Sequence, residues 1–172
     1  MAIIKTAILQ THVYTDKFRN ITQQQNFLPA RSFRGSIWQS CPKCSAAPTK
    51  INTFRNMPKL RAEIPGKNAP GWQRNTEFIL VAGSMPERDE AGNIYNTSYV
   101  FDRNGHQIGK HRKMHLFDID VKGGQYFKES DTLTPGDQVT VFDTEFGKMG
   151  LCICYDFRFP ELARLMVDEG AR

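Results

Sequence analysis

The stretch Gly-Leu-Cys-Ile-Cys-Tyr-Asp-Phe-Arg-Phe-Pro-Glu, residues 150–161, passes from an apolar run to a polar turn and then to the start of a helix. The run from Lys148 to Ile153 predicts a short buried strand that opens toward solvent where Cys154 lies. Pro160 suits the first turn of a helix, and Gly170 suits its end. The apolar stripe of this helix is Leu162, Leu165 and Met166. This strand, elbow and helix would present a nucleophile at the elbow.

The two cysteines of this stretch receive different interpretations. A cysteine in an apolar strand is more often an inert core residue than a catalyst. Cys152 fits that description, because it lies two residues before Cys154 and points to the same face of the strand, deeper inside. Cys154 requires a second feature before it can be interpreted as a nucleophile.

A second segment, upstream, supplies that feature. Residues 109–120 read Gly-Lys-His-Arg-Lys-Met-His-Leu-Phe-Asp-Ile-Asp, and residues 125–137 read Gln-Tyr-Phe-Lys-Glu-Ser-Asp-Thr-Leu-Thr-Pro-Gly-Asp. Alone, the basic cluster at 110–113 would indicate a solvated loop or a phosphate patch. His111 and His115 have the spacing of a metal pair, but no glutamate follows His111 as in a zinc-protease helix, so we expect no metal.

Together these segments closely resemble the nitrilase superfamily of carbon-nitrogen hydrolases, and are nearest to the short amidases of the omega-amidase type. The resemblance covers residues 81–172 and about 1–26. The family uses a glutamate, a lysine and a cysteine, with a second glutamate close by. By motif, the lysine falls on Lys113, the second glutamate on Glu129 and the nucleophile on Cys154. The resemblance implies an α/β fold, a four-layer α-β-β-α sandwich, with no cofactor and often with homo-oligomeric assembly.

The chemistry of amide cleavage suits these three residues. A thiolate at Cys154 is a strong nucleophile when a nearby cation or base favours its formation. The ammonium of Lys113 can also stabilise the oxyanion, and Glu129 would orient the lysine and the departing nitrogen. By resemblance, the substrate is a small carboxamide, the intermediate a thioester and the leaving group ammonia. An omega-amide of a dicarboxylic acid is suggested by the family alone, and a carbamoyl amine or a nitrile stays open.

Residues 29–80 have a different character. They hold six of the nine prolines and no helical or strand periodicity. They also hold nine basic and two acidic residues, a net charge of +7, against 14 basic and 16 acidic residues in the rest of the chain. The basic excess of the chain therefore comes from this window alone.

A shift of reading frame would explain the window. If Ser40 to Pro48 are written with permitted codons and two nucleotides are dropped, the sequence becomes Leu-Pro-Glu-Met-Phe-Cys-Cys-Pro, which resembles the glutamate motif of the family. The shifted reading continues in family style and rejoins the chain at Val81. We therefore expect 29–80 to be out of frame, with Pro42 and Lys43 standing where the general-base glutamate belongs. The chain would then be an inactive or very weakly active remnant.

The window also contains a rival motif, Cys41-Pro-Lys-Cys44. With its basic neighbours this CxxC would suggest half of a zinc knuckle or a nucleic-acid module. No second Cys or His pair follows at the usual distance. A basic or zinc-dependent binding module is thus the weaker alternative, and we expect neither nucleic acid nor zinc as a partner.

Length and composition set the remaining expectations. The chain has 172 residues, 40% of them hydrophobic, whereas the family fold is roughly a hundred residues longer, so we expect a domain truncated at its C-terminus. Lys5 interrupts the initial apolar run, which argues against a signal peptide, and no stretch reaches membrane length. Four cysteines without a disulfide pattern suit the cytoplasm. Residues 102–105 suit a hairpin turn.

Overall fold

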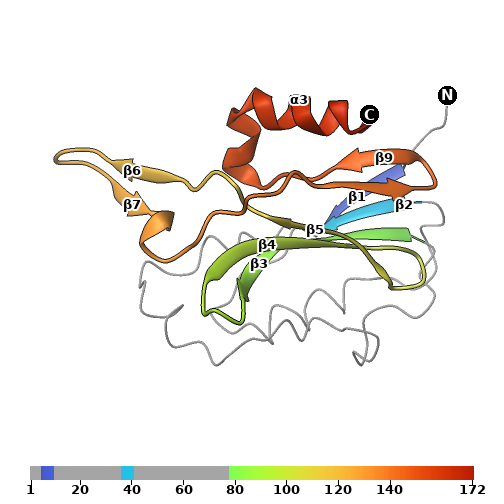
Figure 1. The fold of residues 1–172 in the computed structure, drawn as a ribbon, viewed down its shortest axis with the longest axis horizontal. Helices are drawn as coiled ribbons and strands as arrows, with labels where there is room; N and C mark the ends of the chain where they lie inside the picture. The colour runs from blue at the N-terminus through green and yellow to red at the C-terminus, as the bar shows by residue number, and fades with distance from the viewer. Residues whose placement is uncertain (1–4, 10–35, 41–77) are drawn as a thin grey trace.

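A five-stranded sheet forms the body of the computed structural model, which describes residues 5–9, 36–40 and 78–172. Its strands, in spatial order, are β1 (Lys5–Leu9), β2 (Ser36–Ser40), β3 (Phe78–Arg88), β4 (Ile94–Phe101) and β5 (Gln107–Arg112). The first three run parallel, and β3, β4 and β5 form an antiparallel meander (Figure 1). The predicted opening strand is confirmed by β1. The helix expected to follow it, up to about Asn26, falls outside the described residues.

The hairpin turn predicted at residues 102–105 is confirmed. Asp102 Oδ1 accepts hydrogen bonds from the backbone N–H groups of Asn104 (2.8 Å) and His106 (2.7 Å). Gly105 has φ +81°, a left-handed conformation that glycine adopts without steric cost. The turn therefore sets β4 beside β5, and the residues that follow β5 reach the candidate site.

Two strands correct the expectation that residues 29–80 lack strand structure. β2 lies inside this window, and β3 begins at Phe78. The first three side chains of β3 are at most 4% exposed. A continuous apolar run is typical of a strand buried on both faces, and such a run shows no alternation to detect. Phe78 to Leu80 therefore belong to the same strand as Val81.

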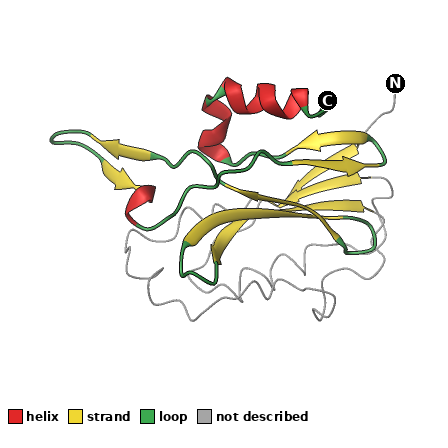
Figure 2. Cartoon of the chain, in the orientation of Figure 1, coloured by secondary structure: helices red, strands yellow, loops and turns green. Residues whose placement is uncertain are grey.

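The second half of the described chain adds two hairpins, two 3₁₀ turns and one α-helix, which lie on one side of the main sheet or project from it (Figure 2). These elements are β6 (Asp118–Asp120), β7 (Tyr126–Lys128), the 3₁₀ turn η2 (Glu129–Asp131), β8 (Val141–Thr144), β9 (Gly147–Gly150), the 3₁₀ turn η3 (Cys154–Arg158) and α3 (Pro160–Asp168). The β6–β7 hairpin projects from the body, whereas α3 lies over β8 and β9 (Figure 1). No helix among these described elements is long and apolar enough to span a bilayer.

Two apolar clusters join the main sheet, the β8–β9 hairpin and α3. Phe142 of β8 packs on Ile79 and Val100, which fastens the β8–β9 hairpin to the main sheet. Leu162 and Met166 of α3 pack against the other side, with Val141 among their neighbours. A methyl group added at Gly150 would lie 2.6 Å from Met166 Sδ, so a larger residue there would have to displace the methionine side chain that joins helix and hairpin.

The predicted helix is confirmed, with one change in its stripe. It begins at Pro160, and Gly170 follows its end with φ +98°. Leu162 and Met166 are buried as predicted, but Leu165 is 48% exposed, so its place in the stripe is wrong. The helix packs on the hairpin along one narrow line, and Leu165 lies beyond its edge.

The predicted buried strand from Lys148 to Ile153 is too long. β9 ends at Gly150 and is largely exposed. Leu151 still donates a backbone hydrogen bond to Thr140, at 3.0 Å, but Ile153 donates to the side chain of Asp156, at 2.9 Å. The Asp156 carboxylate thus accepts a backbone hydrogen bond that the carbonyl of a neighbouring strand would accept if β9 continued. The chain therefore leaves the strand and turns into η3.

Candidate active site

Cys154 occupies a strained position at the start of η3. Its φ is +49°, and among the described residues no other non-glycine has a positive φ. Side chains disfavour this left-handed conformation, which therefore persists only where surrounding contacts impose it. The residue is exposed. The structure thus places Cys154 at an elbow between hairpin and helix, as the sequence predicts.

Cys152 is not the core residue that the sequence predicts. It is exposed, because the segment after β9 leaves the sheet before this cysteine and follows the surface. Partial desolvation of the sulfur and the nearby charge of Asp156 raise the pKa of the Cys152 thiol. The two cysteines therefore share exposure but differ in backbone strain.

Lys113 and Glu129 form a buried ion pair. Their side chains are 1% and 6% exposed, and Lys113 Nζ donates a hydrogen bond to Glu129 Oε2. The same oxygen accepts the backbone N–H of Phe117, at 2.8 Å. A solvated basic loop, the alternative from charge alone, is wrong for Lys113. A lysine buried this deeply requires a carboxylate beside it, because an unpaired buried charge is strongly destabilising.

Backbone contacts hold the lysine in place on both sides. Lys113 N donates to Asn96 O and Lys113 O accepts from Gly136 N, both at 2.8 Å. A methyl group added at Gly136 would lie 2.2 Å from the carbonyl oxygen of Arg112. The Thr-Pro-Gly segment at 134–136 can therefore approach the lysine segment only because position 136 has no side chain.

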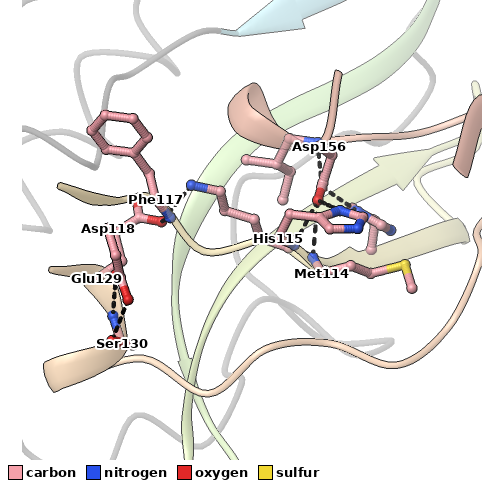
Figure 3. A network of polar contacts seen from close by, with 10 residues as sticks. Met114, His115, Phe117, Asp118, Glu129, Ser130 and Asp156 are labelled. Carbon is pink, nitrogen blue, oxygen red and sulfur yellow. Dashed lines mark hydrogen bonds and ion pairs between the residues drawn. The ribbon is translucent and has the colours of Figure 1, made fainter. Parts of the chain in front are cut away.

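Glu129 is held by the base of the β6–β7 hairpin (Figure 3). Asp118, at the start of β6, accepts hydrogen bonds from Ser130 N (3.1 Å) and Ser130 Oγ (2.6 Å). Glu129 N also donates to Phe117 O, at 3.2 Å. These contacts close η2 against the residues just after Lys113, so the carboxylate of Glu129 faces the ammonium.

Asp156 connects the cysteine turn to the lysine segment (Figure 3). Its carboxylate is fully buried. Oδ1 accepts from Met114 N (3.2 Å), His115 N (2.8 Å) and His115 Nδ1 (2.9 Å), while Oδ2 contacts His111 Nε2 (3.0 Å) and Ile153 N (2.9 Å). Burial alone would raise the pKa of Asp156, but these hydrogen bonds, led by the one from His111, lower it to about 2.

These contacts give the predicted residues their arrangement. Lys113 and Glu129 touch directly, whereas Cys154 is joined to the lysine segment through Asp156, two residues further along the chain. Sequence reasoning gave Asp156 no role. The sequence did contain one signal for this role, which is an acidic residue in the turn directly after the nucleophile. The two histidines with metal-pair spacing, His111 and His115, both contact this carboxylate, on its opposite oxygens.

Aromatic rings add a second connection between the same segments. His115 stacks on Phe159 at 3.7 Å between ring centroids. Tyr155 packs edge-on against both Phe117 (5.1 Å) and Phe159 (5.4 Å). Offset and edge-on aromatic pairs stabilise a contact beyond the area they bury. The rings therefore hold the elbow and the lysine segment together independently of Asp156.

A second buried carboxylate explains the rest of the basic cluster. Glu87 contacts Lys110 Nζ (2.6 Å), Arg112 Nη2 (2.7 Å) and Thr97 Oγ1 (2.7 Å). Burial would raise the pKa of Glu87, but these hydrogen bonds, first that from Arg112, lower it to about 2. Alternation along β5 places these two cations on one face, and His111 on the other. The cluster is therefore a set of paired charges.

The chain resembles known proteins over most or all of its length. Residues 72–172 match the model of the carbon-nitrogen hydrolase family. The chain is 38% identical to the omega-amidase NIT2 of Bos taurus over 175 aligned residues, which cover all of this chain and 62% of that enzyme. The chain belongs to the carbon-nitrogen hydrolase family. It spans less than two thirds of the length of this curated relative.

Solved structures of carbon-nitrogen hydrolases share the fold. Nit3 of Saccharomyces cerevisiae, a member of branch 10 of the nitrilase superfamily, aligns with a TM-score of 0.61 and 34% identity over 89% of this chain and 53% of that chain. A mutant amidase from Nesterenkonia sp. AN1, whose active-site cysteine carries acrylamide, aligns with a TM-score of 0.69 and 19% identity over 99% of this chain and 65% of that chain. The predicted nitrilase-like α/β class is thus confirmed, as is the family.

Proposed function

We propose that this chain has the active-site residues of an amidase that cleaves a small carboxamide through a thioester on Cys154. The sulfur attacks the amide carbon and a tetrahedral intermediate forms. The carbon–nitrogen bond then breaks, and the nitrogen leaves as ammonia after taking up a proton. Water attacks the thioester and releases the carboxylic acid, which returns the thiol. The strained, exposed elbow is the observation that carries this proposal, because it presents one sulfur on a turn that Asp156 joins to the residues directly after the buried Lys113.

Lys113 and Glu129 have supporting roles in this proposal. The ammonium stabilises negative charge, first on the thiolate and then on the oxygen of the tetrahedral intermediate. Glu129 accepts one N–H of that ammonium and so fixes its direction. A charge held in place before the reaction needs no reorganisation as the oxyanion develops, which is why a buried lysine suits this role better than an exposed one.

The relatives support a choice of substrate. Omega-amidases are among the similar proteins, and the Nesterenkonia enzyme of the same fold is an amidase. We therefore propose a short omega-amide of a dicarboxylic acid as the substrate, with no cofactor. We also propose that the protein works in the cytoplasm and, like many members of the family, as a homo-oligomer.

Release of ammonia from short carboxamides tests the proposal. We expect turnover by the wild-type chain and its loss in Cys154→Ala. Cys152→Ala is the matched control, since it removes another exposed thiol two residues away and should retain activity. Equal activity in Cys154→Ala and wild type would refute the role of Cys154.

A second candidate is a remnant that lacks its general base. The observation that favours it is the +7 window at residues 29–80, which has Pro42 and Lys43 where the family glutamate belongs. We propose that this window arose by a shift of reading frame, which sequencing of the coding DNA tests directly. Restoring Leu-Pro-Glu through the shifted reading should raise ammonia release by about 10²- to 10⁴-fold, the usual contribution of general-base catalysis. Equal turnover before and after repair would contradict this candidate.

A further inference from the structure

Asp156 has a set of contacts that only a carboxylate in this position can make. Its two oxygens accept five hydrogen bonds, three from residues 114 and 115, directly after Lys113, one from His111 and one from Ile153, directly before Cys154. All five partners donate, so the site demands an acceptor on both oxygens. An asparagine would turn an N–H group toward one of these donors.

The position of these contacts in the chain is the second observation. They lie at the two ends of the candidate machinery, on the residues next to the nucleophile and next to the lysine. Cys154 has φ +49°, a conformation that costs free energy and relaxes unless neighbouring contacts hold it. The hydrogen bond from Ile153 N to Asp156 Oδ2, at 2.9 Å, closes the turn around this residue.

We infer that Asp156 is a positioning residue, which fixes the strained Cys154 turn against the lysine segment so that the sulfur and the ammonium of Lys113 act as one unit. This inference rests on the proposed function for its purpose, and on the contacts of Asp156 for its geometry. A displacement of about 1 Å between reacting groups can lower a rate a hundredfold, so loss of the carboxylate should affect reactivity more than substrate binding.

Alkylation of Cys154 by iodoacetamide measures this reactivity without requiring amidase turnover. Trypsin releases Cys152 and Cys154 in one peptide, Met149 to Arg158, so the Cys152→Ser background assigns the label to Cys154. In that background, Asp156→Asn should lower the alkylation rate at pH 7 by about ten- to a hundredfold. Glu87→Gln is the matched control, because Glu87 is also a buried carboxylate and its cationic partners lie on the opposite face of β5 from His111, so the rate should stay unchanged.

A double-mutant cycle in the Lys113→Met/Glu129→Gln background, which leaves no buried charge unpaired, separates positioning from general support of the fold. If Asp156 acts through Lys113, Asp156→Asn should slow alkylation less than twofold once the lysine is absent, because the two substitutions remove the same unit. Equal slowing in both backgrounds would overturn the inference, and so would an alkylation rate that is the same with and without the Lys113–Glu129 pair.

Two further measurements cover the case in which Asp156→Asn unfolds. His115→Phe removes one of the five donors while retaining a ring to stack on Phe159, so it should keep the fold and slow alkylation several-fold. An unchanged rate in this folded variant would count against the inference. In the amidase assay, Asp156→Asn should lower kcat and leave KM nearly unchanged. Absence of ammonia release by wild type would refute the proposed function, whereas the alkylation cycle would still decide the role of Asp156.

Discussion

Removal of one charge from the Lys113–Glu129 pair should expose how much the fold depends on it. Glu129→Gln keeps an oxygen that can accept from Lys113 Nζ and from Phe117 N, but it leaves the ammonium without a compensating charge. Lys113→Met removes the ammonium and keeps a chain of similar length. The double variant contains neither charge. These three variants separate the cost of an unpaired charge from the loss of packing.

The magnitude follows from burial. The lysine and glutamate side chains are 1% and 6% exposed, so water cannot replace a lost partner. Breaking a buried pair from one side costs about 3–5 kcal/mol in free energy of unfolding. A domain of this kind has roughly 5–15 kcal/mol in total, so Glu129→Gln should remove a large part of it. The double variant should recover most of that loss, because it leaves no unpaired charge.

Urea unfolding followed by circular dichroism measures these free energies, and ammonia release measures activity in the same samples. We expect the double variant to be stable and inactive, which would assign the pair to chemistry and not to stability. A free energy of unfolding for Glu129→Gln within about 1 kcal/mol of wild type would refute the reasoning, because a buried unpaired ammonium should not be tolerated so easily.

Other perturbations have equally definite outcomes. The pKa of Glu87 is lowered from 4.5 to about 2 in the fold, so its stabilisation is present above pH 4.5 and is lost as the pH falls toward 2. Between pH 7 and pH 3, urea titrations should show a loss in free energy of unfolding that is about 2 kcal/mol larger in wild type than in Glu87→Gln. Gly136→Ala should lower the melting temperature and amidase activity, because its methyl group would meet the Arg112 carbonyl at 2.2 Å. Gly92→Asn would meet no neighbouring atom but must adopt φ +93°, so calorimetry should show a smaller loss that comes from backbone strain alone. The pKa of the Cys152 thiol is raised, so in the Cys154→Ala variant Cys152 should be alkylated slowly at pH 7 and faster as the pH rises. A rate at Cys152 that does not change with pH would contradict this.

The local elements of the C-terminal half were predictable, because short-range signals determine them. Pro160 and Gly170 mark the ends of α3, and residues 102–105 have the turn chemistry of a hairpin. The end of the strand before Cys154 was not predictable, because it depends on Asp156. The carboxylate of Asp156 accepts the backbone hydrogen bond of Ile153, three residues earlier in the chain. Apolar periodicity records which side chains are buried and contains no information about a carboxylate that replaces a strand partner.

The candidate site was predictable by motif and not by charge. A run of basic residues at 110–113 looks solvated when the acids that pair with it are distant in sequence. Glu87 lies 23 residues before Lys110, and Glu129 lies 16 residues after Lys113. Asp156 is also distant in sequence from its partner, since it lies 45 residues after His111. Glu87 is placed by strand β3, whereas Glu129 and Asp156 are placed by the turns η2 and η3. Only the folded chain therefore reveals which positive charge each carboxylate compensates.

The projecting β6–β7 hairpin separates Lys113 from Glu129 in the chain, yet both lie at its base. The ion pair, together with the contacts of Asp118 to Ser130, fastens the two ends of this excursion. Insertions, deletions or exchange of its tip near Gly123 should therefore leave the spacing of the charged groups intact. The β6–β7 hairpin can therefore change in sequence and length, and so change what it contacts, while the ion pair at its base stays in place.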